Sequence, residues 1–354
     1  MTGHPSNEHP VPRHSVPGVR RVVHRAVTGA RGAVPRYTRE LIASVKEERE
    51  RRANGKRGVN GPVVVGPHEA IEALQACELG ALWIGHATVL LRVGGMTILT
   101  DPVFSKRIGM RLGAMTLGLA RVCPPAIEVE HLPPIDLVLL SHAHFDHLDR
   151  PSLKRLVGAG HGRDGALDGT GPGAGAHVVT ASNTRRLVPP GFHDVMELAW
   201  RRSARVTAGA GSVRITAIEP AHWGARTALD RHRRFNSYLI ETNHHRVLFA
   251  GDTAHTHAFD HIGPVDLAVF GIGAYNPWEH AHATPEQVWS MYTRLTDPKH
   301  PKPPPRGHLL PMHHSTFILS REPMDEPLRR LLTTAGDYQK HIVAEMPGKM
   351  WAMG

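Results

Sequence analysis

The chain has 354 residues, 41% of them hydrophobic, and carries a formal net charge of +10 at pH 7. It is long and apolar enough to bury a sizeable core, and its two cysteines, Cys77 and Cys123, exclude a disulfide scaffold or a thiolate metal cage. No apolar run is long enough to span a bilayer, and the basic excess indicates affinity for anions without choosing between nucleic acid, lipid headgroups and phosphorylated substrates.

Residues 1–60 are interpreted as a basic extension, and residues 61–354 as the folded domain. Residues 1–35 are polar, punctuated by proline and glycine, and predicted to be disordered. They contain no apolar signal-peptide core, so we expect a cytoplasmic protein. A helix is predicted near 37–53, because apolar residues recur there at every fourth position: Tyr37, Leu41 and Val45. This arm is expected either to contact an anionic membrane peripherally or to dock on the domain as a solvated helix.

The folded domain opens with three runs of strand character. They cover residues 81–84, 88–93 and 96–100, and Gly94-Gly95 forms a two-residue hairpin turn between the last two. Residues 104–125 are rich in glycine, methionine and arginine and are interpreted as a loop. The apolar residues in that loop belong either to an acyl-binding groove or to the core: Met110, Met115 and Leu117.

The densest cluster of metal-binding side chains follows the apolar segment Asp136–Leu140. His142 and His144, at the end of an extended segment, point to the same face and can hold one cation. Asp146 and His147 follow as the chain turns into a helix, where they can face a second cation. Imidazole and carboxylate are ligands that Zn²⁺ and similar cations accept. A histidine-rich surface loop is the alternative, but it does not explain this spacing directly after a strand.

Further elements follow in the second half of the chain. Pro151 is predicted to open a short helix, and Thr284 to cap a helix that runs through Leu295. Runs of strand character recur at residues 177–180, 213–218, 237–241, 246–251 and 265–271.

Three further candidate ligands each lie at the downstream end of a strand-like run. These are His222, Asp252 and His313, and strand ends that converge on one edge would gather them with the histidine motif. His314 competes with His313 for the last position. Three histidines soon after Asp252 are interpreted as surface or secondary residues: His255, His257 and His261.

These residues carry a family resemblance. The seven candidate ligands, with the stretches Trp83–Thr88, Ile98–Phe104, Leu132–Asp136, Phe249–Thr253 and Gly271–Tyr275, resemble the metallo-β-lactamase superfamily. Within it, the chain is most similar to the branch of N-acyl-phosphatidylethanolamine-hydrolysing phospholipase D. The similarity runs from about residue 80 to the C-terminus. It implies an α/β fold, the four-layer αββα sandwich.

The resemblance also implies a division of the ligands between two Zn²⁺ ions, with iron or manganese as substitutes. One metal takes His142, His144 and His222, the other takes Asp146, His147 and His313, and Asp252 bridges them. The family pattern places a tryptophan after the last histidine, and alignment on Thr316-Phe317 makes His313 the ligand and puts His314 at the tryptophan position.

Catalytic and supporting roles follow from the same resemblance. Bound water deprotonated by the metals would give a bridging hydroxide that attacks phosphorus or carbonyl carbon. Asp146 is expected to guide a proton, and His282 matches a histidine near the substrate. Three neighbours are expected to support the ligands: His86, Asp101 and Asp149. For Asp101 and Asp149, a role as a turn or helix-cap residue is the alternative.

The expected function is hydrolysis of a small-molecule or lipid phosphodiester. A lactonase or carbonyl-ester hydrolase with the same site stays open. A nucleic-acid-binding or membrane-binding protein with a structural metal is less favoured, because a structural zinc site is closed by four ligands and has no use for a bridged pair. With 5% aromatic residues, nucleic-acid binding is not expected. The sequence leaves the oligomeric state unknown.

Overall fold

The computed structural model describes residues 67–353, except residue 114, residues 159–168, residue 210, residues 228–229 and residues 304–306. The N-terminal extension, its expected helix and the expected domain boundary lie outside the described residues. Among the residues that are described, no helix has the length and apolar character needed to cross a bilayer.

The first sheet has seven strands in the order β15-β1-β2-β3-β6-β7-β8. They are β1 (Leu79–Gly85), β2 (Thr88–Val93), β3 (Met96–Thr100), β6 (Leu137–Leu140), β7 (His177–Ala181), β8 (Asp194–Leu198) and β15 (Met350–Ala352). From β15 to β3 neighbouring strands are antiparallel, and from β3 to β8 they are parallel. The expected turn at Gly94-Gly95 is confirmed, with φ of 54° and 80°, values that favour glycine.

The second sheet has six strands in the order β14-β13-β12-β11-β10-β9. They are β9 (Ser203–Ala208), β10 (Gly211–Ile218), β11 (Ser237–Glu241), β12 (Arg246–Phe249), β13 (Leu267–Gly271) and β14 (His308–Met312). β12, β13 and β14 are parallel, whereas the other pairs are antiparallel. Parallel neighbours carry their carboxyl ends to one edge, which is where the candidate ligands follow.

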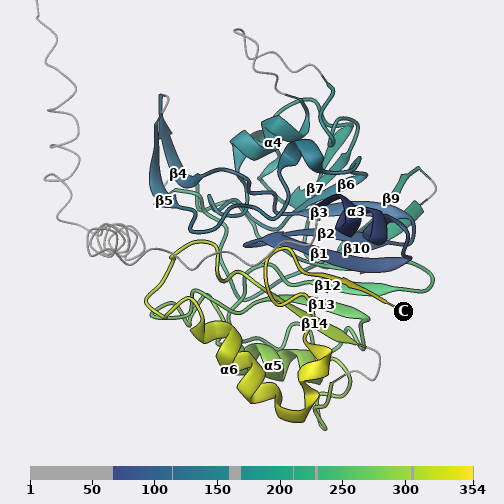
Figure 1. Cartoon of the computed structure of the whole chain (residues 1–354), viewed down its shortest axis with the longest axis vertical. Coiled ribbons are helices and arrows are strands. Elements are labelled where there is room, and N and C mark those ends of the chain that lie inside the picture. The colour runs from purple at the N-terminus through teal and green to yellow at the C-terminus, as the bar shows by residue number, and fades with distance from the viewer. Residues whose placement is uncertain are drawn as a thin grey trace, which may run out of the picture. The chain divides into compact units, whose positions relative to one another are not determined.

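The two sheets pack face to face, and helices cover both outer faces (Figure 1). Trp83, Tyr238 and Phe249 belong to the central layer between the sheets and are fully buried. Alternate residues point the other way, so Leu82 packs under α3 and α4 while Phe270 packs under α5 and α6. The helices are α3 (Pro67–Gln75), α4 (Arg150–Leu156), α5 (Pro285–Arg294) and α6 (Glu326–Ala335). The structure therefore confirms the αββα sandwich.

Both expected helix starts are present. Thr284 accepts a hydrogen bond from the Gln287 backbone, and the Gln287 side chain accepts one from the Thr284 backbone, which completes a capping box at α5. Asp149 caps α4 through the Ser152 backbone. Three short 3₁₀ turns complete the helical content described here: η1 (Val129–His131), η2 (Arg185–Leu187) and η3 (Gly336–His341).

The segment interpreted as a loop contains a hairpin, so that prediction was wrong. β4 (Arg107–Leu112) and β5 (Met115–Ala120) form an antiparallel two-stranded sheet of their own. Figure 1 shows this hairpin standing away from both large sheets. Glycines at residues 109 and 118 interrupt the apolar alternation that would have indicated strands.

Candidate metal centre

The seven predicted ligands meet at one edge of the sandwich. The loop after β6 supplies four of them from the first sheet: His142, His144, Asp146 and His147. The second sheet supplies His222 after β10, Asp252 after β12 and His313 after β14. The two sheets thus face each other across the centre, and each contributes ligand atoms to it.

The first donor group consists of His142, His144, His222 and Asp252, whose ligand atoms all lie within 4.8 Å of one another. His142 Nε2 lies 2.8 Å from His144 Nδ1. Asp252 Oδ2 lies 3.8 Å from the Nε2 atoms of both His142 and His222. This is the set that the sequence assigned to one metal together with the bridging carboxylate.

The second donor group lies beside it and contains Asp146, His147 and His313. Asp252 Oδ2 reaches this group as well, at 3.0 Å from His147 Nε2 and 3.3 Å from His313 Nε2. Asp146 Oδ2 lies 3.4 Å from His313 Nε2 and 3.6 Å from His147 Nε2. Asp252 therefore lies between the two groups, as a bridging ligand would.

His86 is closer to the centre than sequence reasoning placed it. Its Nε2 lies 3.0 Å from Asp146 Oδ2, and it belongs to the second donor group as a fourth member. Its ring lies 4.1 Å from that of His313. Both residues adopt left-handed backbone conformations, with φ of 55° and 62°, and such strain is concentrated at functional sites. No local sequence pattern predicts the contact between His86 and Asp146, because His86 follows β1 and is far from the histidine motif in sequence.

The two adjacent histidines at the end of β14 have different surroundings. His313 joins the donor groups, whereas His314 packs its ring 4.7 Å from Trp83 and places Nδ1 2.8 Å from the Ser315 hydroxyl. Burial lowers the pKa of His314 to about 3, so it is a neutral core residue. The geometry favours His313 as the last ligand.

Supporting residues fix the orientation of the donors. Asp101 accepts hydrogen bonds from the Ser141 backbone and hydroxyl, and its Oδ2 lies 2.7 Å from His147 Nδ1. His222 Nδ1 donates to the Ala281 carbonyl at 2.9 Å, which leaves Nε2 directed at the centre. Asp149 takes no part in this, since its carboxylate serves the start of α4 and the Ser105 hydroxyl.

Sequence reasoning missed Arg226, which holds the motif loop in place. Its guanidinium donates to the carbonyls of Ala143 and Leu148, at 3.0 and 2.7 Å, and lies 4.0 Å from the centre of the Phe145 ring. These partners lie about 80 positions away in the chain, so nothing local could have indicated them. The loop that carries four candidate ligands is therefore held from its outer side.

Burial keeps the first-group histidines neutral. It lowers the pKa of His144 to about 3 and that of His222 to about 4, and the pKa of His142 falls well below its ordinary value. Neighbouring imidazoles lower these values further, because each opposes a second positive charge. Neutral imidazoles present lone pairs, which is the form that binds a metal.

The second group carries opposite charges. Burial lowers the pKa of His147 and His313, but the Asp252 and Asp146 carboxylates outweigh it, so that of His147 lies well above its ordinary value and that of His313 is about 9. Burial likewise raises the pKa of Asp252, yet His147 and His313 hold it well below the ordinary range. Without a metal, protons on His147 and His313 thus balance the carboxylate charges that a bound cation would balance.

The residues present fit a metal centre. His222 Nε2 and Asp252 Oδ1 are buried and have no hydrogen-bond partner among the described residues. Unpartnered buried polar atoms are costly, and a divalent cation is a partner that both an imidazole nitrogen and a carboxylate oxygen of one donor group accept.

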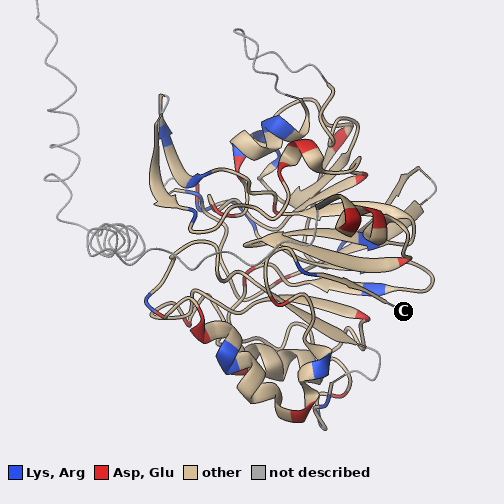
Figure 2. Cartoon of the chain, in the orientation of Figure 1, with Lys and Arg blue, Asp and Glu red and all other residues tan. Residues whose placement is uncertain are grey.

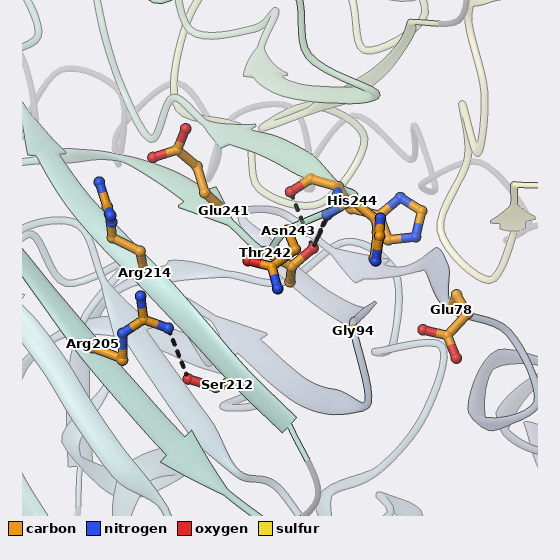
Figure 3. A pocket seen from close by; sticks show the side chains of 10 residues that line it. Glu78, Gly94, Arg205, Ser212, Arg214, Glu241, Thr242, Asn243 and His244 are labelled. Carbon is orange, nitrogen blue, oxygen red and sulfur yellow. Dashed lines mark hydrogen bonds between the residues drawn. The ribbon is translucent and has the colours of Figure 1, made fainter.

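A cavity of about 490 Å³ lies elsewhere in the molecule (Figure 3). It is lined by Glu78, by the Thr242–His245 turn and by Arg205 and Arg214, which are directly opposite each other on β9 and β10. Glu78 precedes β1, and His245 precedes β12, so this part of the lining lies at the strand ends opposite to those that lead to the donor groups. None of the seven candidate ligands lines this cavity, so the metal chemistry is separate from it.

Comparisons with known proteins identify the family and the fold. Residues 96–314 match a family model described as "Beta-lactamase superfamily domain". An uncharacterized protein of Mycobacterium tuberculosis is 32% identical over 279 residues, covering 77% of this chain and 68% of that protein. N-acyl-phosphatidylethanolamine-hydrolyzing phospholipase D 1 of Caenorhabditis elegans is 31% identical over 231 residues, 60% of each chain. The solved isothiocyanate hydrolase from Delia radicum gut bacteria shares the fold, with a TM-score of 0.55 at 16% identity over 78% of this chain and 99% of that one.

Proposed function

Since this chain belongs to the metallo-β-lactamase superfamily, in the branch of the N-acyl-phosphatidylethanolamine-hydrolysing phospholipases D, we propose that it is a dinuclear zinc hydrolase of phosphodiesters with a phospholipid-like substrate. The observation that carries the proposal is the position of Asp252. Its Oδ2 lies 3.0 Å from His147 in one donor group and 3.8 Å from His142 in the other. A structural zinc site needs four ligands and no shared carboxylate, so this arrangement supports catalysis by a metal pair.

Each residue then has a defined task. His142, His144 and His222 would hold one zinc, Asp146, His147 and His313 the other, and Asp252 both. Two bound zinc ions would supply Lewis acidity and water of lowered pKa to the centre. Asp101 keeps His147 in position through the contact at its Nδ1.

Two residues at the rim can reach a substrate. The Asp146 side chain is 13% exposed and that of His282 is 17% exposed, whereas Asp252 is 2% exposed. His282 lies with Nδ1 3.8 Å from Asp252 Oδ2 and its ring stacked at 5.3 Å on His313. We assign Asp146 to proton transfer with solvent or substrate. Burial lowers the pKa of His282 well below its ordinary value, so its neutral ring can donate a hydrogen bond to a phosphoryl oxygen.

The experiment combines elemental analysis with hydrolysis of bis(p-nitrophenyl) phosphate and of a p-nitrophenyl ester, each with and without chelator. We expect about two zinc ions per chain and chelator-sensitive phosphodiester cleavage. His142→Ala and Asp252→Ala should lose metal and activity, whereas His282→Ala should keep its metal and lose turnover on the order of a hundredfold. His255→Ala is the matched control, because this exposed histidine lies three residues after Asp252 and outside both donor groups.

Other outcomes would redirect the proposal. Two metals with ester cleavage alone would indicate a lactonase or carbonyl-ester hydrolase. Activity that persists in metal-free protein would contradict the use of this centre altogether. One tightly held metal without either activity would favour a structural role.

A further inference from the structure

Among the described residues, most of the large hydrophobic side chains that are exposed lie on one element. Met110 is 58% exposed, Met115 66% and Leu117 52%, and all three lie on the β4–β5 hairpin. Tyr338, at 51%, is the other large hydrophobic residue with comparable exposure among the described residues. Single exposed apolar side chains are ordinary on protein surfaces, but several gathered on one element mark an interaction site.

The strand register places these side chains on one face. Ile108 is directly opposite Leu119, and Met110 is directly opposite Leu117. Side chains two positions apart share a face, so Met115 lies on the same side as Leu117. Ile108 and Leu119, at the base of the hairpin, are buried, whereas Met110 and Leu117, two positions further along each strand, are exposed. One face of the hairpin is therefore apolar along its length, buried at the base and exposed to solvent toward the tip.

A glycine pair marks the point where the hairpin leaves the body. Gly109 is directly opposite Gly118, between the buried pair and the exposed pair. A Cβ at Gly109 would lie 2.1 Å from the Leu117 carbonyl oxygen, and one at Gly118 would lie 2.0 Å from that of Ile108. Only glycine permits this close approach of the two strands.

The charged side chains of the hairpin itself are all basic. Residues 105–121 contain Lys106, Arg107, Arg111 and Arg121 and no acidic residue. Figure 2 shows basic positions along the hairpin and at its base. Apolar side chains flanked by Lys and Arg are the chemistry that binds an anionic bilayer surface. A second copy of the chain would bring the same basic hairpin, so charge complementarity favours lipid over self-association.

The base of the hairpin is attached next to the metal centre. Ser105 donates to Asp149 at 2.5 Å, and the Val122 backbone donates to the Thr316 carbonyl at 2.9 Å. The Arg121 guanidinium lies 5.0 Å from the centre of the Phe317 ring, and that ring lies 5.1 Å from the ring of His86. A surface bound by the hairpin would therefore lie near the donor groups.

We propose that the β4–β5 hairpin docks the protein on anionic lipid bilayers. Met110, Met115 and Leu117 enter the interface, and Lys106, Arg107 and Arg111 contact headgroup phosphates. The docking proposal is argued from the hairpin alone. The further idea that docking presents a lipid to the metal centre rests on the proposed function. The N-terminal arm, for which the sequence left peripheral membrane contact open, lies outside the described residues.

The test is co-sedimentation of the full chain with phosphatidylcholine vesicles, with and without phosphatidylglycerol. Wild type should bind the anionic vesicles, and Met115→Ser/Leu117→Ser should bind them at least about tenfold more weakly. Arg111→Gln should reduce the preference for anionic vesicles about fivefold. Tyr338→Ser is the matched control, because it removes an equally exposed side chain elsewhere and should bind like wild type. Met115→Ser alone should show a smaller loss, which keeps the test valid if the double variant aggregates.

Several results would overturn docking by the hairpin. These are no vesicle binding by wild type, equal binding by the double variant, equal loss in Tyr338→Ser, or loss only when residues 1–35 are deleted. Wild-type dimers that dissociate in the double variant, without vesicle binding, would assign the face to a second copy.

Hydrolysis of water-soluble bis(p-nitrophenyl) phosphate separates this proposal from the proposed function. The double variant should cleave this substrate as wild type does, because neither Met115 nor Leu117 belongs to a donor group. Absence of cleavage by wild type, together with vesicle binding that needs the hairpin, would refute the proposed function and leave docking in place.

Discussion

Asp101 and Asp149 are both buried aspartates beside the histidine motif, and they have different partners. Asp101 contacts His147 Nδ1, on the side of the ring away from Asp252. Asp149 accepts from the Ser152 backbone and hydroxyl at the start of α4, and from the Ser105 hydroxyl. From the sequence alone, both could support a ligand or terminate an element.

We predict that Asp101→Asn weakens metal binding about 10-fold to 100-fold, because the amide cannot accept from the Nδ1 proton of His147 as a carboxylate does. Competition with a chromogenic chelator measures the affinity. Asp149→Ala is the control: it removes the cap of α4 and should lower the free energy of unfolding by about 1 kcal/mol with metal affinity unchanged. Equal metal affinity in wild type and Asp101→Asn would remove the supporting role of Asp101.

Residue types, their spacing and their places at strand ends identified the seven candidate ligands, whereas the division into two groups came from the family resemblance. The ligand set assigned from the motif and three strand ends is the set that the fold brings together. His86 and Arg226 were placed less well or missed, because their contacts with Asp146 and with the motif loop depend on tertiary packing. The metal-bound state of every donor stays a prediction.

At the scale of elements, buried strands were the most predictable. β2, β3 and β11 have the bounds expected from their apolar runs, since these strands are buried or nearly so along their length. β8 and β9 lie at sheet edges and mix exposed with buried residues, so their patterns are weak. β15 has three residues and is recognised only through its pairing with β1.

The capping box of α5 gives a prediction about stability. Thr284→Ala removes the acceptor for the Gln287 backbone and should cost about 1 kcal/mol, seen as a fall in melting temperature of about 2–4 °C. Thr333→Ala in α6 is the matched control: its exposed hydroxyl bonds the Arg329 carbonyl within the helix, and alanine is the better helix former. An unchanged melting temperature in Thr284→Ala would show that the cap contributes nothing.

For the whole molecule, the centre connects the two sheets. Four donors come from the first sheet and three from the second, so a cation bound here stabilises only the folded state. We predict that chelation lowers the melting temperature measured by calorimetry, and that added zinc restores it. At zinc a thousandfold above the dissociation constant, linkage contributes about 4 kcal/mol per site. Asp252→Ala should show little of this gain. Equal melting temperatures for loaded and stripped wild type would contradict a centre that joins the sheets.

The distribution of the donors along the chain also affects the order in which the protein can mature during synthesis. The ribosome releases the motif residues long before His313, and β15, which completes the edge of the first sheet, comes later still. A nascent chain that ends before His313 can therefore assemble the first donor group but not the second. A metal that binds the second donor group would therefore do so only after His313 has been translated.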